Sequence, residues 1–187
     1  RALECQQKAL ALHRGVGDRR YEGIHLGNIG DTLVMMGRAD EAVAVFRESI
    51  ALSDDHFPIA AGAFRGSLAV VLAEAGERDA ARTLLAEGQV LVEMNAEELI
   101  KFLCNKGLAL LHMNEHTAAA AALKEARRRA LDANSSGGVE AAQAINTLAA
   151  ALGETSAMGN RHHASPMAPE GVEAENLHEA SAEAVLD

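Results

Sequence analysis

The stretch NIGDTLVMMGRADEA, residues 28–42, decides the fold of this 187-residue chain. In it, the small residue Gly30 is followed three residues later by Leu and seven residues later by Gly37. Counted from Gly37, a small residue follows at five positions, an apolar one at nine and another small one at twelve. The same order returns twice downstream, with Gly76 and Asn114 in the place of Gly37, at intervals of 39 and 38 residues. A motif with such a period predicts an array of structural repeats.

Each copy of the motif predicts two antiparallel helices joined by a short turn. Gly or Asn at the seventh position suits the left-handed backbone conformation that ends a helix. Small residues such as Gly30 and Ala42 let the two helices approach closely, and Leu33 and Phe46 fill the space between them. One helix pair cannot cover its own apolar face, so we expect successive pairs to stack.

The repeat predicts helices along most of the chain. A half-repeat opens it, because Ala2 and Ala9 lie 40 residues before Ala42 and Ser49. We expect helices over residues 1–15, 20–36, 39–53, 58–75, 78–94, 96–113, 115–133 and 138–152. The chain is thus predicted to be all-α, with an α-solenoid over residues 1–152 that contains about three helix pairs, a flanking half-repeat and a capping helix.

Residues 153–187 lose this periodicity and are rich in Gly, Ser, Pro, His and acidic residues. They carry seven acidic residues and one basic residue, which predicts a disordered acidic tail. Most of the formal charge of −10 therefore falls on the tail. The tail either occupies the groove of its own chain or only aids solubility, and we favour solubility.

Composition and charge exclude several classes of partner. The one basic cluster, residues 124–129, does not form the positive stripe that phosphate neutralisation needs, so nucleic acid is not an expected partner. No run of about 18 apolar residues exists, so we expect no contact with a membrane. Cys5 and Cys104 have no metal-ligand spacing and are expected to be buried, reduced thiols, which favours the cytoplasm. The chain begins at Arg1 with helical character and looks like a piece of a longer protein.

No constellation of catalytic residues stands out. His112 and His116 are four residues apart, but Asn114 lies between them where a turn is expected, so they would not share a helix face. Gly15 and Gly17 lack the strand-turn-helix context of a phosphate-binding loop. We therefore expect no catalytic residues, no cofactor and no bound metal.

The motif resembles the tetratricopeptide repeat family, whose signature is met best by Gly30, Leu33, Gly37, Ala42, Phe46 and Ser49. Residues 9–20, leading into residues 26–30, resemble the long-period branch, which includes kinesin light chains, cell-polarity adaptors and the repeat arrays of large bacterial signalling proteins. The resemblance spans residues 1–152 and implies a right-handed superhelix. Two residues depart from the pattern: Arg65 stands where the family often keeps a large apolar residue, and Asn114 replaces the turn glycine.

The resemblance implies a protein–protein interaction module, a scaffold that binds a peptide or protein segment in the concave groove of the array. Alternatively, the chain is a regulatory or oligomerisation segment at the C-terminal end of a larger bacterial signalling protein. In such proteins the arrays follow a kinase, cyclase or ATPase module, or a transcription-regulator module, and serve signal transduction. A module of that kind upstream of Arg1 would favour the second interpretation.

First helices of successive pairs line the concave side of such a superhelix. Asn28, Ser67 and Asn105 occupy the same step of three first helices, and Asn146 is expected to extend this row. Amide side chains donate and accept hydrogen bonds, so the row suits the backbone of an extended peptide, although these side chains could instead bond neighbouring loops or face water. The predicted peptide-binding face consists of Asn28, Asp31, Met35, Ser67, Val70, Glu74, Lys101, Asn105, Leu108, His112 and Asn146.

The charge of this predicted face constrains the partner. Lys101 is nearly its only cation, whereas members of the family that clamp a C-terminal carboxylate need several Lys, Arg and Asn side chains there. We therefore expect a partner with apolar side chains and some positive charge.

Overall fold

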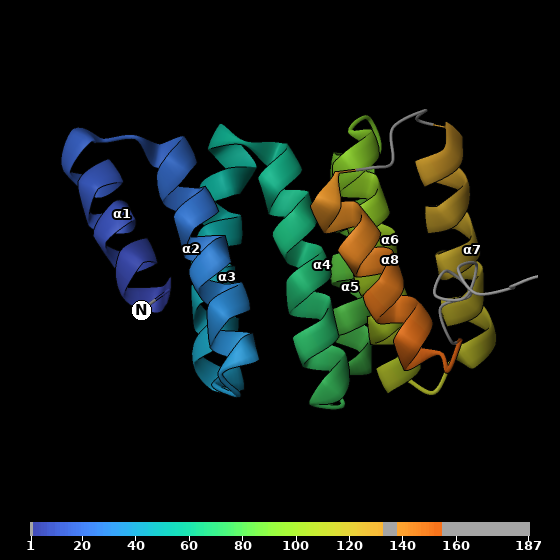
Figure 1. Cartoon of the computed structure of the whole chain (residues 1–187). Coiled ribbons are helices and arrows are strands. Elements are labelled where there is room, and N and C mark those ends of the chain that lie inside the picture. The colour runs from blue at the N-terminus through green and yellow to red at the C-terminus, as the bar shows by residue number, and fades with distance from the viewer. Residues whose placement is uncertain (1, 133–137, 155–187) are drawn as a thin grey trace, which may run out of the picture. The chain divides into compact units, whose positions relative to one another are not determined.

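The computed structural model describes residues 2–132 and 138–154, which fold into eight α-helices and contain no strand (Figure 1). The helices are α1 (Ala2–Val16), α2 (Arg19–Met35), α3 (Ala39–His56), α4 (Pro58–Glu74), α5 (Arg78–Val92), α6 (Ala96–His112), α7 (His116–Asp132) and α8 (Val139–Ala151). All eight were predicted from the sequence, and their ends differ from the prediction by at most three residues. Among the described helices, none has both the length and the apolar character that a membrane crossing requires. The predicted acidic tail lies outside the described residues from residue 155 onward.

The largest difference lies at the end of α3, which continues to His56 instead of ending at residue 53. Pro58 opens α4, and the residue before a proline is disfavoured in the helical conformation. The intervening residue, Phe57, accordingly leaves the helical region, with a φ of −158° and a ψ of 75°. The two helices therefore meet at a single residue instead of a loop.

The first helix of each predicted pair ends in the expected left-handed residue. The φ angles of Gly37, Gly76 and Asn114 are 71°, 85° and 63°. At each turn the following residue donates its N–H to the carbonyl five residues before it, at 2.8 or 2.9 Å, and so closes the helix. Gly153 lies 39 residues beyond Asn114, has a φ of 76° and ends α8 in the same way. α8 therefore has the register of a first helix.

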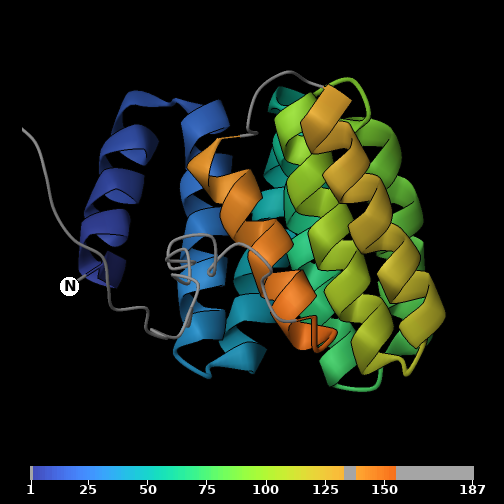
Figure 2. The ribbon, with the colours of Figure 1, turned by 45° about the vertical axis from the view of Figure 1, so that its right-hand side comes forward.

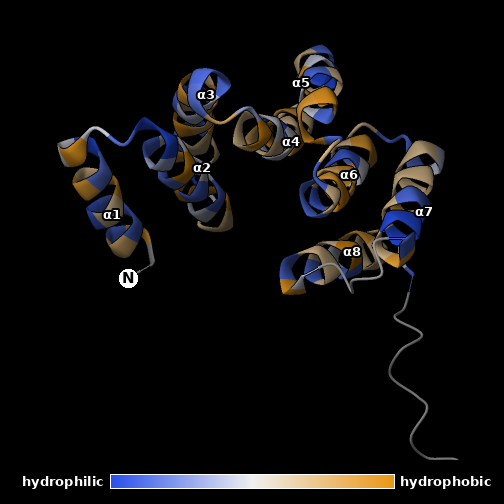
Figure 3. Cartoon of the chain, turned by 90° about the horizontal axis from the view of Figure 1, so that it is seen from above, coloured by the Kyte–Doolittle hydropathy of each residue, from blue (hydrophilic) through white to orange (hydrophobic). Residues whose placement is uncertain are grey.

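The helices pair as α2 with α3, α4 with α5 and α6 with α7, and each pair packs on the next. Seen from above, α2, α4, α6 and α8 follow the inner side of an arc, and α3, α5 and α7 lie outside it (Figure 3). α8 packs against α6 at a tilt (Figure 2). The predicted α-solenoid of antiparallel helix pairs is confirmed, with α1 as the half-repeat at one end and α8 at the other.

Small residues set the distance between paired helices, as the motif predicts. Ala42, Ala81 and Ala119 are completely buried. A Cβ atom on Gly30 would lie 2.6 Å from Cε1 of Phe46, well inside van der Waals contact. Because aromatic residues are only 3% of the chain, the core depends on such close contacts between Ala, Gly and Leu.

Arg65 departs from the family pattern because it bridges two outer helices. Leu26 of α2 and Leu103 of α6, which occupy the positions equivalent to Arg65, are buried in the core. The Arg65 guanidinium instead donates two hydrogen bonds to Asp54 of α3, at 2.7 and 2.9 Å, and one to Glu87 of α5, at 3.2 Å. Its side chain is 12% exposed. The ionic bridge thus joins α3 to α5, which lack direct backbone contact.

The two cysteines differ in burial. Cys104 of α6 is buried, as expected, but the expectation is wrong for Cys5, which is exposed on α1. α1 packs only against α2, so much of its surface has no neighbouring helix among the described residues. Both cysteines are free thiols.

We predict that Gly30→Ala destabilises the fold by roughly 1–3 kcal/mol, because the added methyl group must displace the ring of Phe46. Gly15→Ala is the matched control, since a Cβ atom there meets nothing within 4 Å and alanine favours the helix by up to about 1 kcal/mol. Urea unfolding followed by circular dichroism measures both changes. Equal shifts for the two variants would contradict the close packing of α2 on α3.

Candidate functional site

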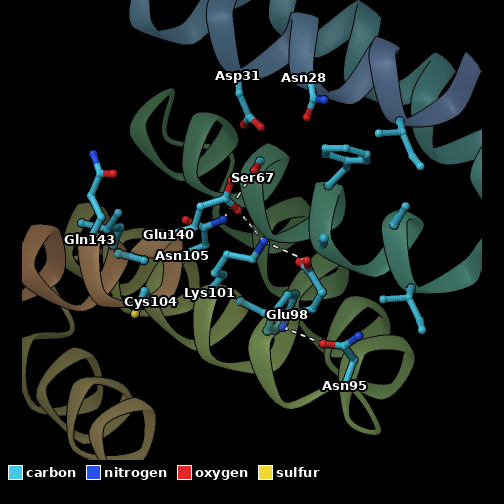
Figure 4. A pocket seen from close by; sticks show the side chains of 18 of the residues that line it. Asn28, Asp31, Ser67, Asn95, Glu98, Lys101, Cys104, Asn105, Glu140 and Gln143 are labelled. Carbon is cyan, nitrogen blue, oxygen red and sulfur yellow. Dashed lines mark hydrogen bonds and ion pairs between the residues drawn. The ribbon is translucent and has the colours of Figure 1, made fainter. Parts of the chain in front are cut away.

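A cavity of about 750 Å³ opens on the inner side of the array, among α2, α4, α6 and α8 (Figure 4). Its volume lies within the usual range of ligand-binding clefts. Its apolar lining consists of Ile24, Met35, Phe57, Ile59, Ala60, Ala63, Phe64, Phe102, Cys104, Leu108 and Ala144. Its polar lining consists of Asn28, Asp31, Ser67, Asn95, Glu98, Lys101, Asn105, Glu140, Gln143 and Thr147.

Seven of the eleven sequence-predicted residues line this cavity, namely Asn28, Asp31, Met35, Ser67, Lys101, Asn105 and Leu108. The structure does not bring the other four to it. Val70 is half-buried against the hydrophobic core. Glu74 and His112 are exposed and are the last residues of α4 and α6, beyond the reach of the cavity. Asn146 is exposed on α8.

The position of Asn146 follows from the register of the turns. Asn28, Ser67 and Asn105 each stand nine residues before the left-handed residue that ends their helix. In α8 the residue at that step is Ala144, which lines the cavity, whereas Asn146 lies two residues further on. Two residues turn a helix by about 200°, so Asn146 points to a different face and does not extend the row.

The three remaining members of the row lie around one opening. Asn105 Nδ2 donates a hydrogen bond to Ser67 Oγ at 3.4 Å, between neighbouring repeats. Asn28 and Asp31 project from α2 towards these residues from the opposite wall (Figure 4). The Asn28 amide forms no side-chain hydrogen bond with the described residues, so both its donors and its acceptor are available to a ligand.

Lys101 holds two carboxylates at the cavity. Its ammonium nitrogen lies 2.8 Å from Glu98 Oε1 and 3.0 Å from Glu140 Oε2, and the second contact joins α6 to α8. Burial alone would lower the pKa of Lys101, but the hydrogen bonds and charges of the two carboxylates outweigh burial and raise it. Sequence analysis missed both acids. Glu98 lies three residues before Lys101, a helical pairing distance that could have identified it, whereas Glu140 is in another repeat and is revealed only by packing.

Asp31 is the least favourably placed charge of the cavity. Burial raises its pKa to about 6, although the Ser67 hydroxyl and the Lys101 ammonium act in the opposite direction. It forms no ion pair with the described residues, since Lys101 pairs with other carboxylates. A desolvated carboxylate in a cleft is typical of a binding site rather than of a structural ion pair.

The lining residues offer hydrogen bonds, charges and apolar contacts. Burial raises the pKa of Cys104 to about 12, so its thiol stays protonated and is a poor nucleophile. Neither His nor Tyr occurs in the lining. In the part of the chain that the structure describes, no three His, Cys, Asp or Glu side chains group as metal ligands, and His112 and His116 belong to different helices.

We predict that Asp31→Asn raises the free energy of unfolding by roughly 1–3 kcal/mol at pH 7.5. The pKa of Asp31 is about 6 in the folded protein against an ordinary value of 3.8, so the folded state binds this proton more tightly than the unfolded state does. The penalty of the ionised carboxylate is therefore complete above about pH 7 and disappears as the pH falls towards 4. Urea unfolding of both proteins at pH 7.5 and pH 4.5 measures this penalty. A variant no more stable than wild type at pH 7.5 would contradict the desolvation of Asp31.

A family model described as tetratricopeptide repeat matches residues 1–55, which include α1, α2 and nearly all of α3. No curated protein matches the chain. The match includes the first copy of the motif, and the relation to the long-period branch stays a prediction. The helix pairs that follow residue 55 continue the same architecture and the same turn register. Residues 1–55 thus match the tetratricopeptide repeat family, and the described helix pairs beyond them have the same all-helical repeat architecture.

Proposed function

We propose that this chain binds an extended segment of another protein in the cavity on the inner side of its helical array. The observation that carries the proposal is the row of Asn28, Ser67 and Asn105, which three successive repeats contribute to one cavity. Repeats of this family generally mediate protein–protein interactions and are not typically enzymes.

The spacing of the row suits an extended polypeptide. Neighbouring packed helices lie about 8–10 Å apart, and three residues of extended chain span about 10 Å. A segment that crosses α2, α4 and α6 would therefore pass one polar side chain of the row about every third residue. Because amide and hydroxyl groups both donate and accept, the row can bond the backbone of such a segment whatever its sequence.

The apolar lining supplies the other part of the binding energy. Phe57, Ile59 and Ala63 are each half-buried in the free protein and line the cavity, so a bound apolar side chain would remove their exposed surface from water. Each Å² of apolar surface buried contributes about 25 cal/mol. Apolar contacts would thus provide affinity, while the polar row fixes the position of the bound backbone.

We predict that the full chain selects peptides through this cavity. A phage-displayed library of random dodecapeptides is panned against the wild-type protein and against Ala63→Trp, which places an indole in the cavity. Ala44→Trp is the matched control, because Ala44 is exposed on the outer helix α3 and does not line the cavity. We expect wild type and Ala44→Trp to enrich the same peptides and Ala63→Trp to lose them.

Circular dichroism and thermal melting confirm that both tryptophan variants are folded before panning. If Ala63→Trp retains the peptides that wild type selects, or if no peptide is enriched at all, the cavity is not the binding surface. Such a result would overturn the proposed function.

We further predict that Asn28→Ala combined with Asn105→Ala weakens the binding of a selected peptide by about tenfold or more. Two hydrogen bonds to the backbone of the peptide are lost in this variant. Fluorescence anisotropy of the labelled peptide measures the dissociation constant. Asn146→Ala is the control, since it is the same change at an exposed residue outside the cavity, and it should leave the affinity unchanged. If wild type, the double variant and Asn146→Ala bind the peptide with equal affinity, the polar row does not contribute to binding.

A further inference from the structure

We propose that the segment bound in this cavity carries a lysine or arginine that pairs with Asp31, next to an apolar residue that packs on the facing patch of Ile24, Phe57, Ile59, Ala60 and Ala63. We call these five residues the apolar patch. This inference rests on the proposed function and specifies the chemistry of the partner.

The first argument is the state of Asp31 in the free protein. Its side chain is half-buried, faces the opening of the cavity and has no ion-pair partner among the described residues (Figure 4). Lys101, the one cation in the lining, lies between Glu98 and Glu140 at 2.8 and 3.0 Å. A carboxylate that burial has removed from water regains a favourable interaction when a ligand brings a cation to it.

The second argument is the net charge of the lining. Asp31, Glu98 and Glu140 are its three carboxylates, and Lys101 is its one ammonium group, so the lining has a net charge of −2 when Asp31 is ionised. This charge attracts a basic segment and repels an acidic one. Residues 153–187 of the same chain carry seven acidic residues and one basic residue, so charge disfavours them as the occupant.

The third argument is the alternation of side chains along an extended chain. On α2, Asp31 lies three residues after Asn28, and Ile24 of the apolar patch lies four residues before it. The two therefore flank the polar row, each about one helical turn away, on opposite sides. Successive side chains of an extended segment point in opposite directions. A segment bonded along the row would thus direct one side chain to Asp31 and the adjacent one to the apolar patch.

The pairing predicts a pH dependence of binding. The pKa of Asp31 in the free protein is raised to about 6 by burial, with Ser67 and Lys101 opposing the shift. A bound cation favours the ionised carboxylate, so binding releases the proton that Asp31 holds below that pH. Lys101, Glu98 and Glu140 are the other charged groups of the lining, and no histidine is among them. Affinity should therefore fall by about tenfold between pH 7.5 and pH 5.

The test uses the peptides that wild type selects and Ala63→Trp does not, which removes peptides held only by the acidic surface of the protein. We expect them to be enriched in a basic residue directly adjacent to a large apolar one. One such peptide without His, Asp or Glu is synthesised and labelled. Its affinity is measured by fluorescence anisotropy at pH 5 to 8 for wild type, Asp31→Asn and Glu74→Gln.

We expect Asp31→Asn to bind this peptide about tenfold more weakly than wild type at pH 7.5 and to show no pH dependence over that range. Glu74→Gln removes an exposed carboxylate outside the cavity and should match wild type at each pH. The variants are compared only after thermal melting shows that each is folded.

Two results would overturn the inference while the proposed function stands: selected peptides that depend on the cavity but lack the basic and apolar pair, or equal affinities of wild type and Asp31→Asn. If no peptide depends on the cavity, the proposed function itself fails, and this inference fails with it. The panning step therefore separates failure of the function from failure of the partner chemistry.

Discussion

A backbone residue with positive φ ends each inner helix, and the position of every side chain on the concave face depends on it. An α-helix has about 3.6 residues per turn, so the residue at which a helix ends determines which of its side chains face inward. The side chains nine positions before these turns meet at one cavity, although they lie 39 or 38 residues apart in sequence. Asn114 can replace glycine because asparagine tolerates the left-handed conformation better than most residues.

The two sides of the inner helices have opposite effects on stability. Towards the outer helices, small residues bring backbones together, and the contact of Gly30 with Phe46 leaves no room even for a methyl group. Towards the cavity, the same helices expose half-buried apolar groups and the desolvated Asp31, which both lower stability. Lys101 offsets part of the charge imbalance there by holding two carboxylates. Such a division is common in binding proteins, where the site is less stable than the scaffold that positions it.

Local sequence was sufficient for the helices, their pairing and much of the inner face, because turn residues and small residues act at fixed distances along the chain. It failed where position depends on packing between repeats. Glu140 reaches the cavity because α8 packs against α6, and the half-buried Arg65 is neutralised there by Asp54 and Glu87 of two other helices. Asn146 was misplaced for a different reason, since the turn at the end of α8 puts Ala144, and not Asn146, at the position of the row.

The common register of the turns also determines where this protein tolerates changes in length. One residue inserted between Ser67 and Gly76 would rotate Ser67 by about 100° around the axis of α4 and remove it from the row. The same insertion in the junction between α5 and α6 would leave every inner helix in phase. The repeats of this chain agree with this division, because the intervals between turns differ by one residue while the distance from Asn28, Ser67 and Asn105 to the turn is nine residues in each. We therefore expect insertions and deletions to be tolerated in the outer helices and the junctions, where they leave the register of the concave face unchanged.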